Sequence, residues 1–440
     1  MKMAQQLEAP LDCAPKGTWL LTFKARLRRR ESQDIVLGGS LIMLLSTTLV
    51  SGVNFFYNVA MARMMGPSEF GHVTAAVTLL MLASAVTLSF QIVCAKLVAQ
   101  HDLPGAKAGL YRSMARRAWI ASLTLGLVLF AGQKPLAAFL RLPDPWILGV
   151  LAIGIAAYAP LGVHRGAMQG TCSFGRLGSN FIVEATARFL IAVVLVAAGY
   201  GVLGAVGAIS ASVVVACILP PIPKELQIQP LPGVHPPMRE AFQAMVFFVG
   251  QVIINNVDIL MVKHFFPPQQ AGLYAAVALI GRVLYLGAWS VVSAMFPVSA
   301  ASKKRAEQQQ VVFLPMVLVF GLVVVFVLTV SFLPQAIMHG VFGVKFAEGG
   351  PLLALYAAAT GLYAISVVMM AYEMSRRKAS TAWLQLIFSG GVILAISIFH
   401  HDLRQVIVVQ VVLMALMLLL VSAGFFRRHN QILAEEAAAA

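Results

Sequence analysis

Charged residues are scarce in this chain. Only 11% of its 440 residues are Asp, Glu, Lys or Arg, whereas about 25% is usual in soluble domains. Acidic residues are the scarcer group, with 17 Asp and Glu against 32 Lys and Arg, which gives a net charge of +15. Hydrophobic residues make up 60% of the chain, and the mean hydropathy is +0.85. This composition excludes a soluble protein, and we attribute the positive charge to membrane-protein loops rather than to nucleic-acid binding.

Motifs of catalysis and metal binding are also missing. The four cysteines, Cys13, Cys94, Cys172 and Cys217, lie too far apart for a zinc site or a disulfide framework. The sequence contains no Ser-His-Asp or Cys-His set and no nucleotide-hydrolysing loop. We therefore expect neither an enzyme nor a metal protein.

A cleavable signal peptide is not indicated, because the mostly polar residues 1–34 precede the first apolar run. We interpret this segment as a basic cytoplasmic tail. Apolar runs long enough for a transmembrane helix, which needs roughly 20 residues, then recur through the chain. They start near Ile35, His72, Ala118, Trp146, Phe181, Val202, Ala241, Gly272, Val311, Pro351, Thr381 and Leu403. The sequence thus predicts an all-α polytopic membrane protein with about twelve transmembrane helices.

The basic residues indicate the orientation of these helices. Of the 32 Lys and Arg, 24 fall on the loops and tails of one face and 6 on the other, while Arg188 and Arg282 lie inside predicted helices. Because basic loops remain in the cytoplasm, we expect both termini to be cytoplasmic in a bacterial inner membrane.

A proline-rich segment divides the chain in two. Seven prolines between positions 220 and 237 cannot continue a helix and favour an extended linker. We therefore predict a six-helix lobe over 35–219, a cytoplasmic linker over 220–240, a second six-helix lobe over 241–426 and a tail over 427–440.

The two halves resemble each other at a spacing of 201 residues. This shift aligns four pairs: Asn54 with Asn255, Pro67 with Pro268, Gly71 with Gly272, and Ala75 with Ala276. Six predicted helices separate the copies, so both begin on the same side of the membrane. Parallel repeats of this kind are typical of transporters whose site lies between two lobes.

Polar residues follow one face of each repeated helix. The first face consists of Thr47, Ser51, Asn54 and Asn58, and the second of Gln251, Asn255 and Asp258. Such residues either join neighbouring helices by hydrogen bonds or line a cavity. For the Ser and Thr residues we favour helix contacts, and for Asn255, Asn256 and Asp258 we favour a cavity.

Arg282 lies about 15 Å into its predicted helix, with Tyr285 and Trp289 on the same face. This stripe suits a cationic site with aromatic walls for a phosphate and a sugar. An ion pair between Arg282 and Asp258 is the alternative, and the two interpretations are compatible.

Two further sets of charges have a simpler interpretation. Glu184 and Arg188 are spaced as an intrahelical ion pair. His164 and Arg165 lie near a cytoplasmic helix end, where contact with lipid headgroups is expected.

Several short motifs together resemble a known family. They are Met64-Met65-Gly66-Pro67-Ser68-Glu69-Phe70-Gly71, Arg165-Gly166-Ala167-Met168-Gln169-Gly170 with Phe174, Arg188, Gly199-Tyr200-Gly201-Val202-Leu203-Gly204-Ala205, and Ala271-Gly272-Leu273-Tyr274 with Phe296-Pro297. In these the chain resembles the polysaccharide-biosynthesis oligosaccharide flippases of the multidrug/oligosaccharidyl-lipid/polysaccharide exporter superfamily.

This resemblance implies two six-helix lobes around a V-shaped central cavity. It implies movement of undecaprenyl-pyrophosphate-linked oligosaccharide from the cytoplasmic to the outer leaflet, driven by a proton or sodium gradient or by the membrane potential. We expect no cofactor other than a coupling proton or sodium ion. Arg282 would hold the pyrophosphate and Asp258 would couple the ion. Sugars would face Asn54, Asn58, Asn255, Tyr285 and Trp289. Relatives often place several basic residues in the cavity, whereas here only Arg282 is central.

Two other functions remain open at this point. A multidrug cation antiporter of the same superfamily would favour acidic cavity residues, and Asp258 is the one deep acid in the predicted cavity. A membrane-embedded polysaccharide polymerase or acyltransferase would favour a large outer loop, which the sequence lacks. The expected partners are the lipid bilayer, the lipid-linked oligosaccharide and the polymerase or export proteins of polysaccharide assembly, but not nucleic acid.

Overall fold

The computed structural model describes residues 19–101, 103–219, 223, 226–229, 231, 238–301, 305–375 and 380–439. Within these residues every regular element is helical. The elements are α1 (Trp19–Gln100), α2 (Pro104–Ala131), α3 (Gln133–Phe139), α4 (Trp146–Gly170), α5 (Phe174–Leu195), η1 (Val196–Tyr200), α6 (Gly201–Ile218), α7 (Met238–Phe265), α8 (Pro268–Gly281), α9 (Val283–Ala301), α10 (Arg305–Phe332), α11 (Pro334–Phe342), η3 (Val344–Gly349), α12 (Gly350–Ser375), α13 (Ser380–Ile398) and α14 (Leu403–Ala439).

Glycine and proline determine where the long helices bend. Helix α1 has 82 residues, but Gly66 adopts φ 80° directly before Pro67, so the element consists of two segments. Glycine adopts a positive φ without strain, and proline is tolerated at the start of a helix, here the second segment of α1. Likewise, Gly199 at φ 92° and Gly201 at φ 48° form the tight turn between α5 and α6. Each bend separates two predicted membrane spans.

Membrane-length helices account for the predicted spans. Eight described helical stretches are long and apolar enough to cross a bilayer, and two of them, Leu41–Gln100 and Phe174–Ile218, are interrupted by the bends above. The stretch Trp383–Ile398 is apolar but shorter, and α7 has 28 residues. Dividing the two interrupted stretches and adding α7 and α13 gives the twelve predicted segments. The prediction of a polytopic all-α fold is therefore confirmed.

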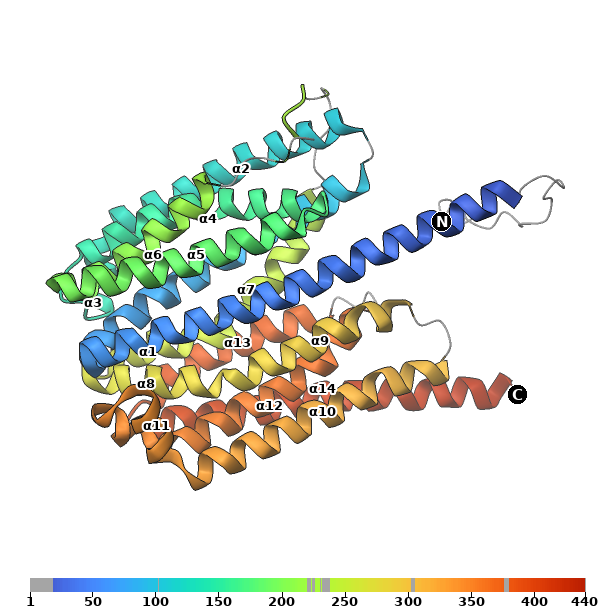
Figure 1. Cartoon of the computed structure of the whole chain (residues 1–440). Coiled ribbons are helices and arrows are strands. Elements are labelled where there is room, and N and C mark those ends of the chain that lie inside the picture. The colour runs from blue at the N-terminus through green and yellow to red at the C-terminus, as the bar shows by residue number, and fades with distance from the viewer. Residues whose placement is uncertain are drawn as a thin grey trace.

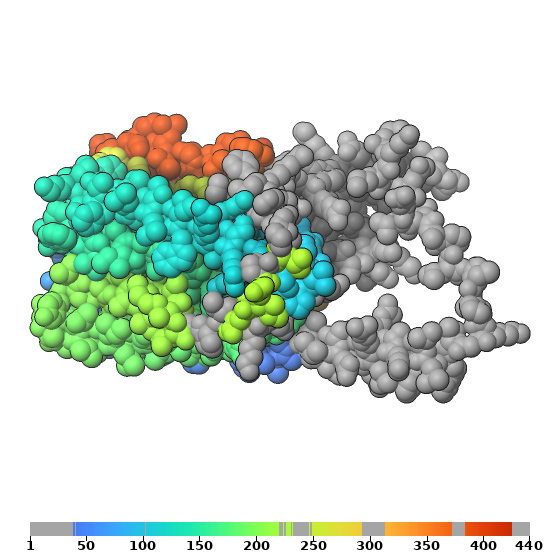
Figure 2. Space-filling model, turned by 90° about the horizontal axis from the view of Figure 1, so that it is seen from above, coloured from blue at the N-terminus to red at the C-terminus, as the bar shows by residue number. Residues whose placement is uncertain are grey.

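The segments form two lobes (Figure 1). Helices α2, α4, α5 and α6 lie on one side of α1, and α8, α9, α10, α12 and α14 lie on the other. The chain ends lie at one end of the bundle, and the short helices α3 and α11 lie at the opposite end. Figure 2 shows the face of the N-terminal lobe, which residues of α2 to α6 cover in cyan and green.

The lobes meet at the end that carries α3 and α11, which we call the closed end. An added Cβ at Gly272 would lie 1.7 Å from the carbonyl oxygen of Pro67, and one at Gly71 would lie 2.9 Å from the backbone nitrogen of Gly272. Phe70 packs its ring against Phe342 and Phe346, at centroid distances of 6.3 and 5.9 Å. The backbones of the two lobes are thus in contact at Gly71 and Gly272, which are equivalent residues of the 201-residue repeat.

The hydrogen bonds of the closed end repeat in the same way. Arg63 of the first lobe donates to the carbonyl oxygens of Val341, at 2.8 Å, and Gly340, where α11 ends. His264, its equivalent 201 residues later, contacts the carbonyl oxygen of Phe139 at 2.7 Å, where α3 ends. Among the described residues, the side-chain hydrogen bonds that join the two lobes all lie here. These reciprocal contacts confirm a parallel internal repeat.

Most of the predicted linker over 220–240 lies outside the described residues, as do residues 1–18 of the predicted tail. Two described residues of the linker contact the N-terminal lobe: Leu226 is buried, and the N–H of Leu231 donates to the carbonyl of Gly105 at 3.0 Å. Residues 238–240 already belong to α7, which begins at Met238. Helix α1 already begins at Trp19, and α14 continues to Ala439, so both helices extend into the predicted tails.

Candidate functional site

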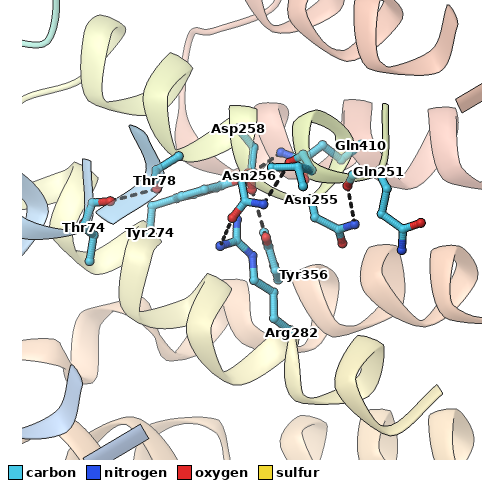
Figure 3. A network of polar contacts seen from close by, with 11 residues as sticks. Thr74, Thr78, Gln251, Asn255, Asn256, Asp258, Tyr274, Arg282, Tyr356 and Gln410 are labelled. Carbon is cyan, nitrogen blue, oxygen red and sulfur yellow. Dashed lines mark hydrogen bonds and ion pairs between the residues drawn. The ribbon is translucent and has the colours of Figure 1, made fainter. Parts of the chain in front are cut away.

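A buried carboxylate organises the C-terminal lobe (Figure 3). Asp258 on α7 is 3% exposed. Its Oδ2 accepts hydrogen bonds from the hydroxyls of Tyr274, at 2.8 Å, and Tyr356, at 2.9 Å. Gln410 of α14 donates to the hydroxyl of Tyr274 at 2.6 Å. Helices α7, α8, α12 and α14 thus converge on one acidic group.

Arg282 completes this network as an ion pair. It stands at the break between α8 and α9, and its Nη2 lies 3.0 Å from Oδ1 of Asp258. Its Nη1 donates to Oδ1 of Asn256 at 3.2 Å, whereas its buried Nε has no hydrogen-bond partner. The predicted alternative of an Arg282–Asp258 pair is therefore present, because pairing offsets the cost of placing either charge in a bilayer.

Aromatic side chains stack beside this ion pair. The ring of Tyr285 lies 6.3 Å from Trp289 and 5.8 Å from Tyr363, in both cases within 30° of parallel. Gln251 donates to the hydroxyl of Tyr285, and Asn255 donates to that of Tyr363 at 3.2 Å. The polar face predicted on α7 therefore points into its own lobe, where it fixes an aromatic stack.

A second charged network lies in the N-terminal lobe. Glu184 of α5 forms ion pairs with Arg165 of α4, at 2.5 Å, and with Arg188 one turn along its own helix. Arg165 also donates to Oδ1 of Asn180 at 2.7 Å and lies 4.0 Å from the ring centroid of Phe181. The predicted Glu184–Arg188 pair is confirmed, but it belongs to a larger network.

The headgroup prediction for His164 and Arg165 is wrong. Both side chains are about 5% exposed, and Arg165 is bound to Glu184. The ring of His164 packs on Tyr111 at a centroid distance of 6.5 Å. Helix α4 carries them inward because α1 and α2 cover this part of it; Gly166, for example, packs on the carbonyl of Gln91.

The four residues of the polar face predicted on α1 differ in their exposure. Thr47 and Ser51 are exposed, whereas Asn54 and Asn58 are half-buried. Asn54 accepts a hydrogen bond from Nη1 of Arg188 at 3.2 Å, and Asn58 donates to the backbone of Asn54 at 2.8 Å. Asn54 therefore belongs to the N-terminal network.

The structure thus brings the predicted site residues together as two groups. The C-terminal group contains Asp258, Arg282, Asn255, Tyr285 and Trp289. The N-terminal group contains Asn54 and Asn58, together with Arg188. Among the described residues, no hydrogen bond or ion pair joins the two groups.

Sequence reasoning missed several members of both networks: Tyr274, Tyr356, Tyr363, Gln410, Arg165 and Asn180. Three of these residues, Asn180, Tyr356 and Tyr363, had a signal in the sequence. Asn180, Glu184 and Arg188 recur every four residues and therefore share a helix face, as do Tyr356 and Tyr363 at a spacing of seven. The other contacts join helices whose packing the sequence does not reveal.

Comparison with known structures identifies the fold. An inward-facing multidrug resistance MATE family transporter of the MOP superfamily aligns with a TM-score of 0.71 at 12% identity, over 91% of this chain and 99% of its own. The lipid II flippase MurJ, in an inward closed conformation, aligns with a TM-score of 0.73 at 13% identity, over 88% of this chain and 87% of its own. An outward-facing MATE transporter gives a TM-score of 0.63 at 14% identity, over 89% of this chain and 96% of its own.

Sequence comparison gives the family. No curated protein matches the chain. Residues 60–348 match the family described as polysaccharide biosynthesis protein. This match covers more than half of the chain, extends into both lobes, and includes the closed end and the charged residues of both networks. The chain therefore belongs to the polysaccharide biosynthesis protein family, with the fold seen in MOP superfamily transporters.

Proposed function

We propose that this chain is a flippase that carries a lipid-linked oligosaccharide from the cytoplasmic to the outer leaflet for polysaccharide biosynthesis. The observation that carries the proposal is the reciprocal contact of two repeated lobes at one end of the bundle. Lobes that meet at one end can rock to open that end and close the other, which is alternating access. The family match, to polysaccharide biosynthesis proteins, supports an oligosaccharide cargo.

The basic residues suggest which end faces the cytoplasm. Most Lys and Arg are predicted on the face that carries the termini, and the termini lie opposite the closed end. The closed end would then face outward, with access from the cytoplasm of a bacterial inner membrane. The higher TM-scores with inward conformations, 0.71 and 0.73 against 0.63, support this orientation.

The C-terminal group suits the head of such a substrate. The stack of Tyr285, Trp289 and Tyr363 offers flat apolar faces for sugar rings, and the amides of Gln251 and Asn255 lie at its edge. The guanidinium of Arg282 would bind a pyrophosphate once it leaves Asp258, because arginine matches phosphate oxygens in a bidentate geometry.

Asp258 is the proposed coupling residue. Without Arg282, its carboxylate would be a bare charge in the membrane, which is costly unless a proton or sodium ion binds. The hydroxyl oxygens of Tyr274 and Tyr356 lie beside it, so the position offers the oxygen ligands that a hard cation prefers. Substrate binding at Arg282 would thereby favour ion binding at Asp258.

Deletion of the gene in its bacterial host tests the proposed function. We expect loss of surface polysaccharide and accumulation of its lipid-linked repeat unit in the inner leaflet, measured by lipid extraction and mass spectrometry. Expression of the full chain from a plasmid should reverse both effects. Normal polysaccharide together with increased sensitivity to cationic dyes would contradict the proposal and favour a multidrug antiporter.

A further inference from the structure

Two buried basic side chains lie where the lobes meet at the closed end. Lys263, in the last turn of α7, is 1% exposed, and His72 of α1 is 7% exposed. Neither the Nζ of Lys263 nor the Nδ1 of His72 has a hydrogen-bond partner. A buried ammonium group in this state is costly, because it has lost its water and gained no acceptor.

Packing between the lobes brings these two side chains together. Ala75, Leu140 and Leu260 form one buried cluster, to which α1 and α7 both contribute. His72 precedes Ala75 by three residues, so the two share a helix face. Lys263 follows Leu260 at the same spacing on α7. In agreement with this placement, the charge of Lys263 acts electrostatically on His72.

The charge at this position is positive throughout. Arg141, which follows α3 and is exposed, also acts electrostatically on Lys263. Within the part of the chain that the structure describes, no carboxylate forms an ion pair with Arg141, Lys263 or His72. A water molecule would satisfy hydrogen bonds here but would leave the charge uncompensated. The partner that these groups lack is therefore an anion.

The internal repeat shows that packing alone does not require basic residues at these positions. The 201-residue shift aligns Lys263 with Ala62 and His72 with Leu273. Ala62 is fully buried and Leu273 is 6% exposed, so apolar side chains fill the equivalent positions of the other half. The basic pair is thus a feature of one half only, and it calls for a role other than filling the core.

We propose that Lys263 and His72 bind a small inorganic anion, of which chloride is the expected species, and that this anion bridges the lobes and stabilises the closed end. Lys263 supplies ammonium donors from the C-terminal lobe, and His72 supplies a ring N–H from the N-terminal lobe. Burial restricts the ligand to a small ion. This proposal goes beyond the proposed function and does not depend on the cargo.

The position of the site links anion binding to closure. Each lobe contributes one of the two donors, so the site is complete only when the lobes are in contact. An anion would therefore bind the closed end in preference to the open end, and its binding would shift the equilibrium toward closure.

Thermal unfolding of the purified full-length protein tests the site. Sodium chloride is compared with sodium gluconate at the same sodium concentration, so that any sodium bound at Asp258 is unchanged. The parent should unfold a few degrees higher in chloride, because the anion binds the folded state. The variant His72→Leu/Lys263→Ala carries the side chains of the other half, so it should fold, and it should lose this difference. Lys134→Ala, at an exposed position of α3, should keep it.

A second measurement tests the effect on closure. In a chain whose native cysteines are replaced by alanine, the buried position Ala75 is changed to cysteine and its reaction with a water-soluble thiol reagent is followed. With chloride at about ten times its Kd, the reaction should slow about tenfold relative to gluconate. The same cysteine in the His72→Leu/Lys263→Ala background should react at equal rates in both salts.

Three results would overturn the proposal. Equal unfolding temperatures of the parent in chloride and gluconate would remove the anion. A chloride effect that persists in folded His72→Leu/Lys263→Ala would place the anion elsewhere. An unchanged rate for the cysteine at position 75 would remove its role in closure. None of these measurements involves oligosaccharide, so a failure here is distinct from a failure of the proposed flippase.

Discussion

At the scale of single residues, the two lobes neutralise their buried carboxylates with different partners. Asp258 receives two tyrosine hydroxyls and one guanidinium, whereas Glu184 receives two guanidinium groups. The first arrangement is neutral and the second is cationic. The two repeats therefore differ at equivalent positions, since the 201-residue shift aligns Asp258 with Tyr57. This difference indicates that the equivalent helices have diverged in function.

The Asp258–Arg282 pair leads to a prediction about stability and coupling. Asp258→Asn should lower the free energy of unfolding by about 3 kcal/mol, the smaller end of the range for a broken buried pair, because Arg282 keeps 20% of its side chain exposed. The double variant Asp258→Asn/Arg282→Gln should recover most of this loss, since no charge remains unpaired. Thermal unfolding of the purified variants measures both effects.

The same variants test ion coupling. Oligosaccharide flipping by Asp258→Asn in liposomes should no longer respond to a proton or sodium gradient, because no carboxylate remains to bind the ion. Flipping that still follows the gradient in this variant would remove Asp258 from the coupling mechanism, whatever its effect on stability.

At the scale of elements, the repeat is most regular where the lobes touch. Helices α3 and α11 begin 201 residues apart, at Gln133 and Pro334, and each has, in its last turn, a carbonyl that the other lobe binds. Close backbone contact at Gly71 and Gly272 leaves no room for a side chain. The closed end is therefore built for an approach that only glycine permits.

Gly272→Ala should open the closed end. Its Cβ would lie 1.7 Å from the carbonyl oxygen of Pro67, so the backbones must separate. A cysteine placed at Ala75, which is fully buried against Leu140 and Leu260, should then react with a water-soluble thiol reagent. In Gly391→Ala, where an added Cβ meets nothing within 4 Å, the same cysteine should stay protected. Equal protection in both variants would show that the contact does not hold the lobes together.

The sequence predicts elements better than the contacts between them. Apolar length locates the spans, and the 201-residue shift identifies equivalent residues of the two halves, because these signals are local or repeated. The partners of Asp258 were found only in part, because Tyr356 lies 98 residues away from it in the chain and no periodicity links the two residues. Arg165 was misplaced for the same reason: its burial depends on the helices that cover α4.

At the scale of the whole molecule, the direction of transport depends on which end faces outward. The termini and the closed end lie at opposite ends of the bundle, so one orientation fixes the other. Glu348 is exposed in η3 at the closed end, whereas residue 307 lies in the first turn of α10 at the opposite end. Cysteines at these two positions report the orientation directly.

The final prediction follows from the excess of basic residues on the face of the termini. In a chain whose native cysteines are replaced by alanine, Glu348→Cys should react with an impermeant thiol reagent added to intact cells. Glu307→Cys should react only after the membrane is opened. That result would place the closed end outside, so the lobes as observed would receive substrate from the cytoplasm. The reverse pattern would place the closed end inside, and the proposed direction of flipping would then be wrong although the fold and the repeat would stand.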